Sequence, residues 1–133
     1  MTRIMHRDGE CVLFEGGETI AEAVELAVKA KANLIGADLS RANLSRADLS
    51  GANLSRADLS WVSGLIDLGQ RTDGYRFLIQ RFDDHARIKA GCRYFSVVEA
   101  RKHPWSILGE SLARIELGVT LARAAGWTIG DET

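Results

Sequence analysis

Residues 32–61 read ANLIG-ADLSR-ANLSR-ADLSG-ANLSR-ADLSW, six consecutive copies of one five-residue unit. Each copy begins with Ala and has Leu at its third position, and Asn alternates with Asp between them. A period of five fits neither an α-helix nor a flat β-strand. A short repeat of this kind predicts a solenoid whose units each bury one large and one small side chain and stack on one another. We therefore expect Leu and Ala to point inward.

The pattern resembles the pentapeptide-repeat family, in which a central Leu or Phe and a small residue two positions earlier lie inside a right-handed, four-sided β-helix. The resemblance implies four pentapeptides per coil, so that Leu34 stacks under Leu54 and Leu39 under Leu59. The six copies then make one and a half coils. The polar side chains of the units are expected to face outward and to serve turns and solvated surface: Asn33, Asp38, Asn43, Asp48, Asn53, Asp58, Arg41, Arg46 and Arg56.

Longer members of that family are best known as mimics of duplex DNA that protect topoisomerases. Two features of this chain disfavour that function. Residues 32–61 carry three Asp and three Arg and so have no net charge, whereas duplex DNA is densely negative. One and a half coils also span only on the order of 10 Å, because neighbouring strands lie about 4.8 Å apart. A topoisomerase-protecting DNA mimic is therefore the least favoured alternative.

The composition is typical of one globular domain, with 133 residues, 46% of them hydrophobic, and a net charge of −1. The sequence has neither an apolar run long enough to cross a membrane nor the apolar segment of a secretion signal, so we expect a cytoplasmic protein. Two cysteines are too few to staple a small secreted fold. We expect Cys11 and Cys92 to be reduced and buried.

The segments around the repeat are expected to cap it, because a short repeat stack needs covered ends. Residues 3–15 predict a β-hairpin that turns at Asp8-Gly9. Thr19 and Glu22 form a capping-box pattern that opens a helix over residues 20–31. We therefore divide the chain into a hairpin and capping helix (1–31), the repeat β-helix (32–64) and a C-terminal α+β module (65–133).

The C-terminal module is predicted to contain a small antiparallel sheet, with strands over residues 66–68, 75–82 and 86–90. Ser96 and Glu99 open a short helix that Pro104 stops. A last helix over about residues 108–125 is closed by Gly126. Its apolar stripe is expected to comprise Leu108, Leu112, Ile115, Val119 and Ala122. The fold class is therefore mainly β: a short right-handed quadrilateral β-helix between a hairpin–helix cap and an α+β module.

Residues 87–101, together with Trp105 and the segment ARAAGW at 122–127, resemble the C-terminal module of small pentapeptide-repeat proteins carried by bacteriophages. The resemblance brings no catalytic motif. It implies a context, since small phage accessory proteins often inhibit host defence. If a phage encodes the chain, its expected location is the cytoplasm of the host cell.

A basic and aromatic cluster is the main candidate site. Residues 71–103 carry eight Arg and Lys and four Asp and Glu, so their net charge is +4. An arginine beside an aromatic ring can hold a phosphate and stack on a base. The candidate ligand-binding residues are Arg71, Arg76, Arg81, Arg87, Lys89, Arg93, Tyr75 and Tyr94. The alternatives are a solvated sheet face over an aromatic core and a patch for an acidic protein partner.

The sequence predicts no catalytic residue, metal ligand or cofactor. Cations near Cys92 favour its thiolate, but no spacing places His85 or His103 beside it as a base. The spacing of His and Cys is not that of a zinc site, and Gly69–Gly74 is more typical of a turn than of a phosphate-binding loop. A cysteine-dependent enzyme is thus an alternative that full function in a Cys92→Ser variant would exclude.

We predict a non-enzymatic binding protein, a phage-type inhibitor of host defence that either sequesters a signalling nucleotide or occludes a host protein. The main alternative is a structural or oligomerisation module. A homodimer or higher homo-oligomer is expected, because the exposed edges of a short solenoid and the last helix favour symmetric pairing. Nucleic acid and membranes are not expected as partners.

Overall fold

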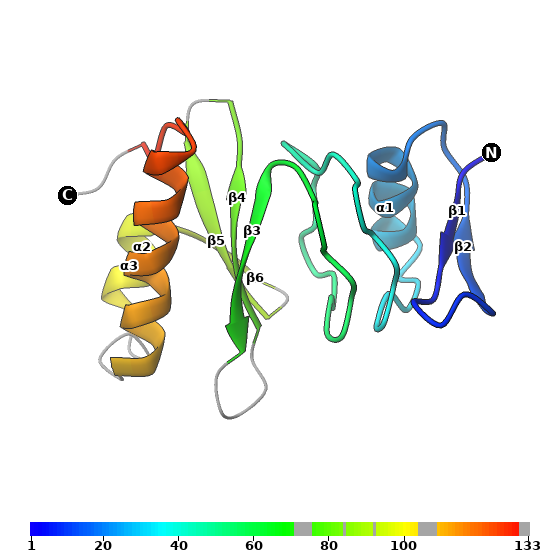
Figure 1. The fold of residues 1–133 in the computed structure, drawn as a ribbon, viewed down its shortest axis with the longest axis horizontal. Coiled ribbons are helices and arrows are strands. Elements are labelled where there is room, and N and C mark those ends of the chain that lie inside the picture. The colour runs from blue at the N-terminus through cyan, green and yellow to red at the C-terminus, as the bar shows by residue number, and fades with distance from the viewer. Residues whose placement is uncertain (71–75, 84, 92, 104–108, 131–133) are drawn as a thin grey trace.

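The structure is a computed structural model that describes residues 1–70, 76–83, 85–91, 93–103 and 109–130. Its elements form layers along the long axis of the molecule (Figure 1). A hairpin and helix α1 lie at one end, the repeat segment follows, and a four-stranded sheet with helices α2 and α3 on its far side forms the other end. The repeat segment therefore lies between two caps.

The N-terminal cap consists of the predicted hairpin and helix. Strands β1 (Arg3–Met5) and β2 (Val12–Glu15) pair antiparallel, and Gly9 takes a φ of 80° in the turn between them. Helix α1 (Ile20–Lys29) begins where Oγ1 of Thr19 accepts the amide of Glu22 at 3.1 Å. The helix ends two residues earlier than predicted, because Lys31 takes the left-handed φ of 56° at which the repeat begins.

The repeat segment buries its leucines and alanines, as predicted. The five leucines from Leu34 to Leu54 are at most 3% exposed, and the five alanines from Ala37 to Ala57 at most 6%. Ala32 and Leu59, at the two ends of the stack, are only half-buried. Parallel bridges join residues that are twenty positions apart, Asp38 with Asp58 and Asn43 with Ser63. Residues that are four repeat units apart therefore lie side by side.

The outward positions of each unit form its turn. In all six units the Oδ1 atom of Asn or Asp accepts the backbone amide two residues later, at 3.0–3.1 Å. The fifth residue of each unit has a positive φ, and these residues are Gly36, Arg41, Arg46, Gly51, Arg56 and Trp61. Short carbonyl-bearing side chains and left-handed corners are ordinary turn chemistry. The alternation of Asn with Asp thus has a local structural role.

The C-terminal sheet has four antiparallel strands in sequence order: β3 (Leu65–Gln70), β4 (Arg76–Arg81), β5 (Ala86–Ala90) and β6 (Arg93–Ser96). Three of them correspond to predicted strands, and β5 has the predicted bounds. Strand β6 was not predicted. The predicted turn at 69–74 and the turn at 83–85 lie partly outside the described residues.

Two helices cover the far face of the sheet. Helix α2 (Val97–Lys102) has the full capping box, because Ser96 and Glu99 each accept the other's backbone amide. Helix α3 (Gly109–Ala124) is closed by Gly126, with a φ of 82°, and by the amide of Trp127, which donates to the carbonyl of Ala122. Pro104 lies outside the described residues.

The apolar stripe of α3 differs from the prediction at one position. Ile115, Val119 and Ala122 are buried as expected, but Leu112 is 40% exposed. The buried stripe turns away from Leu112 because Gly118 lies against Leu68 of β3, where an added Cβ would be 2.7 Å from its side chain. Leu108 lies outside the described residues.

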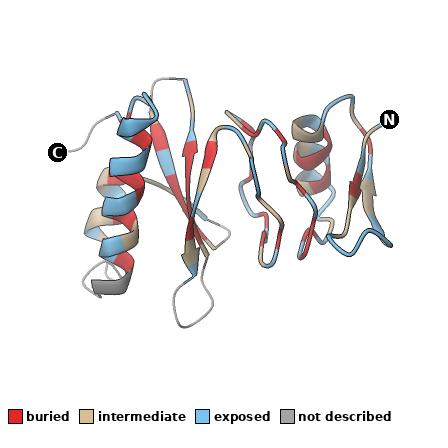
Figure 2. Ribbon diagram, viewed as in Figure 1, coloured by how far each residue is buried: buried red, intermediate tan, exposed pale blue. Residues whose placement is uncertain are grey.

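Two hydrophobic clusters lie on opposite sides of the sheet (Figure 2). One fills the coil and includes Leu65 and Leu78 from the sheet, and the other lies between the sheet and the helices and includes Phe77 and Ile79. Neighbouring residues of β4 therefore serve different clusters, as the pleat of a strand requires. The sheet face toward the repeats also carries four of the eight residues that were predicted to bind a ligand, Arg76, Arg87, Lys89 and Tyr94.

Candidate functional site

The structure divides the predicted ligand-binding cluster. Arg71 and Tyr75 lie outside the described residues, as does Cys92. The cross-strand pairs of the sheet place Arg76, Arg87, Lys89 and Tyr94 on the face toward the repeats. Arg81 pairs with Ala86 and Arg93 with Ala90, so both belong to the opposite face. The eight residues therefore do not line a single site.

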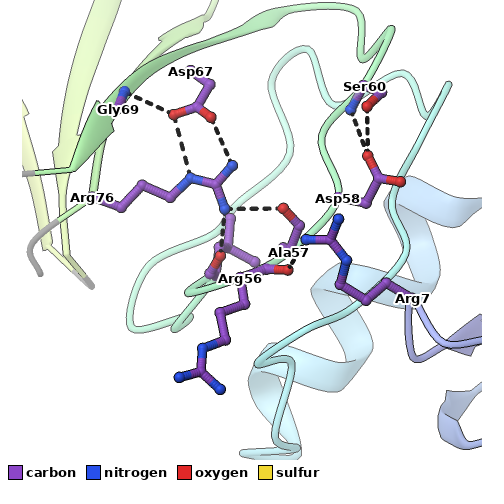
Figure 3. Close-up of polar contacts among 9 residues, drawn as sticks. Arg7, Arg56, Ala57, Asp58, Ser60, Asp67, Gly69 and Arg76 are labelled. Atoms are coloured by element: carbon purple, nitrogen blue, oxygen red, sulfur yellow. Dashed lines mark hydrogen bonds and ion pairs between the residues drawn. The ribbon is translucent and has the colours of Figure 1, made fainter.

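Arg76 binds the end of the coil (Figure 3). Its Nη1 donates to the carbonyls of Leu54 at 2.7 Å and Ala57 at 3.1 Å. The other side of the guanidinium pairs with the carboxylate of Asp67 at 2.8 Å. Burial raises the pKa of Asp67, but the hydrogen bonds from Arg76 and the amide of Gly69 outweigh it and leave this pKa below the ordinary value.

Two further side chains of the sheet, Gln80 and Lys89, donate hydrogen bonds to carbonyls of the coil in the same way. Nε2 of Gln80, which is fully buried, donates to the carbonyls of Leu44 and Ala47, each at 2.8 Å. Nζ of Lys89, also fully buried, donates to the carbonyl of Ala52 at 2.6 Å.

Tyr94 completes the network. Its hydroxyl accepts the amide of Leu49 at 3.0 Å and donates to Oε1 of Gln80. Burial raises the pKa of Tyr94, so the hydroxyl stays a neutral donor. Arg76, Gln80, Lys89 and Tyr94 therefore form a polar cap on the backbone of the coil, and we call these four residues the sheet cap. Three of them are candidates that the sequence analysis assigned to a ligand.

Arg87 remains at a small pocket beside the sheet cap. The pocket has a volume of about 250 Å³ and is lined by His85, Arg87, Tyr94, Phe95, Ser96 and Glu99. The guanidinium of Arg87 lies 5.1 Å from the ring centre of Phe82, and its Nε donates to Nε2 of His85 at 3.0 Å. The carboxylate of Glu99 on the pocket wall disfavours a phosphate there.

Arg81 and Arg93 are exposed on the other side of the sheet. The guanidinium of Arg93 lies 5.9 Å from the ring centre of Phe95. Neither residue lines the pocket at Arg87.

A groove on the repeat segment was not predicted. It has a volume of about 400 Å³, and its floor is formed by residues 57–60 and its walls by Arg7 on one side and by Asp67 and Arg76 on the other. Nη1 of Arg7 donates to the carbonyl of Arg56 at 2.8 Å (Figure 3). Arg7 and Arg76 belong to different caps, so only the fold brings them together.

Asp58 on the groove floor is held by its own repeat unit. Its Oδ1 accepts the hydroxyl of Ser60 at 2.6 Å and the amide of Ser60 at 3.0 Å. These hydrogen bonds lower the pKa of Asp58 below its ordinary value, and the charges of Arg7 and Arg76 add to the effect. The carboxylate therefore stays ionised at neutral pH.

Trp61 follows the groove floor directly. Its side chain is 83% exposed, the largest exposure among the described aromatic residues, and its backbone is left-handed with a φ of 60°. A bulky residue in this conformation is unusual. The sequence offered one signal for it, since Trp replaces the Gly or Arg that ends each of the other five units.

Cysteine and metal chemistry has little support in the described part of the chain. Cys11 is exposed and lies before β2, so the prediction of a buried strand residue was wrong. Within the described ranges, no three His, Cys, Asp or Glu side chains come together as metal ligands. None of the described helices is long and apolar enough to span a membrane.

Comparison with known proteins identifies the repeat segment. The pentapeptide-repeat family matches residues 30–63 in eight copies. No curated protein and no solved structure gives a significant match to the chain. The predicted pentapeptide repeats are thus confirmed, whereas the likeness of the C-terminal module to phage proteins stays a prediction.

Proposed function

We propose that this chain, which carries pentapeptide repeats, is a non-enzymatic binding protein that acts by covering a surface of a protein partner. The observation that carries the proposal is the exposure of Trp61 beside the groove. Tryptophan is among the residues most enriched at the energetic centres of protein interfaces. Here it occupies a left-handed position for which Gly is better suited. The side chain of Trp61 is exposed, although its left-handed backbone lowers the stability of the fold. Contact with a partner best explains why Trp occupies this position.

The proposal includes the finer architecture of the repeats. We propose that they form one and a half turns of a right-handed, four-sided coil. The bridges at a separation of twenty residues and the left-handed residue at the end of every unit support this geometry. Such a coil has flat sides. The groove lies on the side formed by residues 57–60, and Trp61 lies at the corner where this side ends.

A protein partner is favoured over a signalling nucleotide. Arg76, Lys89 and Tyr94 already bind backbone atoms of the coil, so they are not available to hold a phosphate. The pocket at Arg87 is small and includes a carboxylate. Occlusion of a protein surface therefore has more support than sequestration of a nucleotide.

The biological context of the proposal is inhibition of host defence by a phage protein. It rests on the resemblance of residues 87–101 to modules of small phage proteins. On this proposal the partner is a component of a bacterial defence system.

Self-association is a second candidate role, favoured by a specific feature of α3. Leu117 and Leu121 lie one helical turn apart and are 49% and 39% exposed. The pair points away from Ile115 and Val119, which face the sheet. Replacing both leucines with Gln tests this role by light scattering: loss of a dimer supports it, and a wild-type protein that is already a monomer refutes it.

The variant Trp61→Arg tests the main proposal. Arginine ends three of the other five units with the same left-handed backbone, so the variant is expected to fold normally. Val12→Arg is the matched control, because it adds the same side chain at an exposed position of the hairpin.

Proteins that the immobilised wild type captures from host lysate are identified and purified. Each is then titrated against the wild type, Trp61→Arg and Val12→Arg. Loss of binding in Trp61→Arg, with binding retained in Val12→Arg, supports the proposal. Equal binding by wild type and Trp61→Arg refutes it.

A further inference from the structure

Three exposed arginines, Arg7, Arg41 and Arg56, lie in or next to the segments that form the groove. Arg7 uses one nitrogen to bind the carbonyl of Arg56. The side chains of Arg41 and Arg56 have neither an ion pair nor a hydrogen bond with any residue that the structure describes. Each guanidinium has five N–H donors in a fixed plane. Most of the donor capacity of these arginines is therefore available to a partner.

Backbone contacts place these arginines near the groove. The amide of Arg41 donates to the carbonyl of Ser60 at 2.9 Å, which places Arg41 next to Ser60 and Trp61. Arg56 precedes the groove floor, and Arg7 is bonded to its backbone. The backbone of Arg41 thus lies at the Trp61 end of the groove floor, and Arg7 lies on the hairpin side, next to the backbone of Arg56.

The acidic residues of the same surface already have partners. Asp38 and Asp58 accept the amide and hydroxyl of Ser40 and Ser60. Asp67 is paired with Arg76. At least one oxygen of each of these aspartates is therefore already bound, whereas most donors of Arg7, Arg41 and Arg56 are not, although the formal charge of the surface is small, four arginines against three aspartates.

We infer that this surface binds an acidic segment of a protein, with carboxylates of the partner on Arg7, Arg41 and Arg56 and an apolar side chain on Trp61. The inference rests on the proposed function and adds the chemistry of the partner. Separate carboxylates suit separate guanidiniums, since each pair can form two parallel hydrogen bonds. A nucleic acid is disfavoured, because a surface with a net charge of +1 and three carboxylates does not attract a continuous row of phosphates.

The test selects binders from a displayed library of random short peptides on the wild-type protein. The selected peptides are then titrated against a variant that combines Arg7→Gln, Arg41→Gly and Arg56→Gly. Glycine suits the two corner positions because Gly36 and Gly51 end other units with the same left-handed backbone. Arg46→Gly is the matched control, since Arg46 is also a corner residue but is paired with Asp83.

The expected result is a selected pool rich in Asp and Glu, whose members bind the triple variant at least about tenfold more weakly, a loss of about 1.4 kcal/mol. Their affinity should also fall as salt is added. The control Arg46→Gly should bind like the wild type.

Other outcomes separate the inference from the proposed function. A neutral apolar pool whose binding needs Trp61 overturns the inference but supports a protein-binding function. Peptides that bind Trp61→Arg as well as wild type refute both. Tighter binding of a fluorescent single-stranded oligonucleotide than of any selected peptide, lost in Trp61→Arg, overturns the inference in favour of nucleic acid.

Discussion

Gln80 is the residue at which the role of the sheet cap can be measured most directly. Replacing it with Leu keeps the approximate size of the side chain and removes its amide. The carbonyls of Leu44 and Ala47 then lose donors at 2.8 Å, and the hydroxyl of Tyr94 loses its acceptor. A buried polar group left without a partner costs about 1–3 kcal/mol.

The expected loss is smaller than the sum of three such costs. The hydroxyl of Tyr94 lies 3.3 Å from the carbonyl of Ala47 and can donate to it instead. Leucine also gains from burial, by about 1 kcal/mol relative to an amide. We therefore expect Gln80→Leu to lower the free energy of unfolding by about 2–3 kcal/mol, a large part of the roughly 5–15 kcal/mol of an ordinary domain.

Urea unfolding followed by circular dichroism measures this loss. The chain offers a matched control, because its only other glutamine, Gln70, lies exposed on β3. Gln70→Leu should change stability by less than about 0.5 kcal/mol. If Gln80→Leu costs no more than Gln70→Leu, the sheet does not hold the coil through its polar side chains and the reasoning fails.

Three further predictions concern the turns and one ion pair. Gly64→Ala should destabilise far more than Gly51→Ala in urea unfolding: both positions are left-handed, but an added Cβ at Gly64 would lie 2.6 Å from the backbone of Ser45, and at Gly51 it meets nothing within 4 Å. Trp61→Gly should raise the free energy of unfolding by about 1 kcal/mol, because it relieves a left-handed bulky residue, and an unchanged or lower value would contradict the strain argument. The carboxylate of Asp67 has a folded pKa below the ordinary 3.8, so its stabilisation is full above about pH 5 and is lost as pH falls through the folded value. Unfolding of wild type and Asp67→Asn should therefore differ at neutral pH and converge in acid, and a constant difference from neutral pH to pH 2 would refute that assignment.

The repeat segment could be predicted because its information is local. Every fifth residue repeats the same environment, so the buried positions follow from the pattern alone. The hairpin, α1 and the capping box at Ser96 could also be predicted, since each depends on residues that are close together in the sequence.

Positions that depend on tertiary contacts were predicted less well. Leu112 matched the helical spacing, but the contact of Gly118 with Leu68 sets the buried face of α3. Cys11 was assigned to a strand, yet β2 starts at Val12 and the hairpin contains a register shift between Ile4 and Met5. Strand β6 has only four residues and runs directly into α2, so the strong capping signal at Ser96 obscured it.

The candidate site was misread for a physical reason. Arg and Lys side chains can donate hydrogen bonds either to a phosphate or to a backbone carbonyl. The amino-acid composition therefore does not distinguish a ligand site from contact with the protein's own backbone. The alternation of Arg76, Leu78 and Gln80 on β4 was the available signal, because it places two polar side chains and a leucine on one face. A face with both kinds of residue is typical of a sheet that packs on another part of the chain.

The polar residues of the sheet cap match backbone groups at the end of the short coil. Residues 55–63 pair with residues 36–44, and no further repeat unit follows to cover the other side of residues 44–57. Five carbonyls and one amide of this region are bound by the four side chains of the sheet cap. Acceptors dominate that surface, and therefore Arg, Lys, Gln and Tyr are the residue types that can close it. Two of the eight cations that first pointed to a ligand, Arg76 and Lys89, thus bind carbonyls of the coil. The side chains of Arg41 and Arg56 make no such contact with the described residues, and Arg7 uses only one nitrogen, on the carbonyl of Arg56. The search for a partner should begin with those three arginines and Trp61.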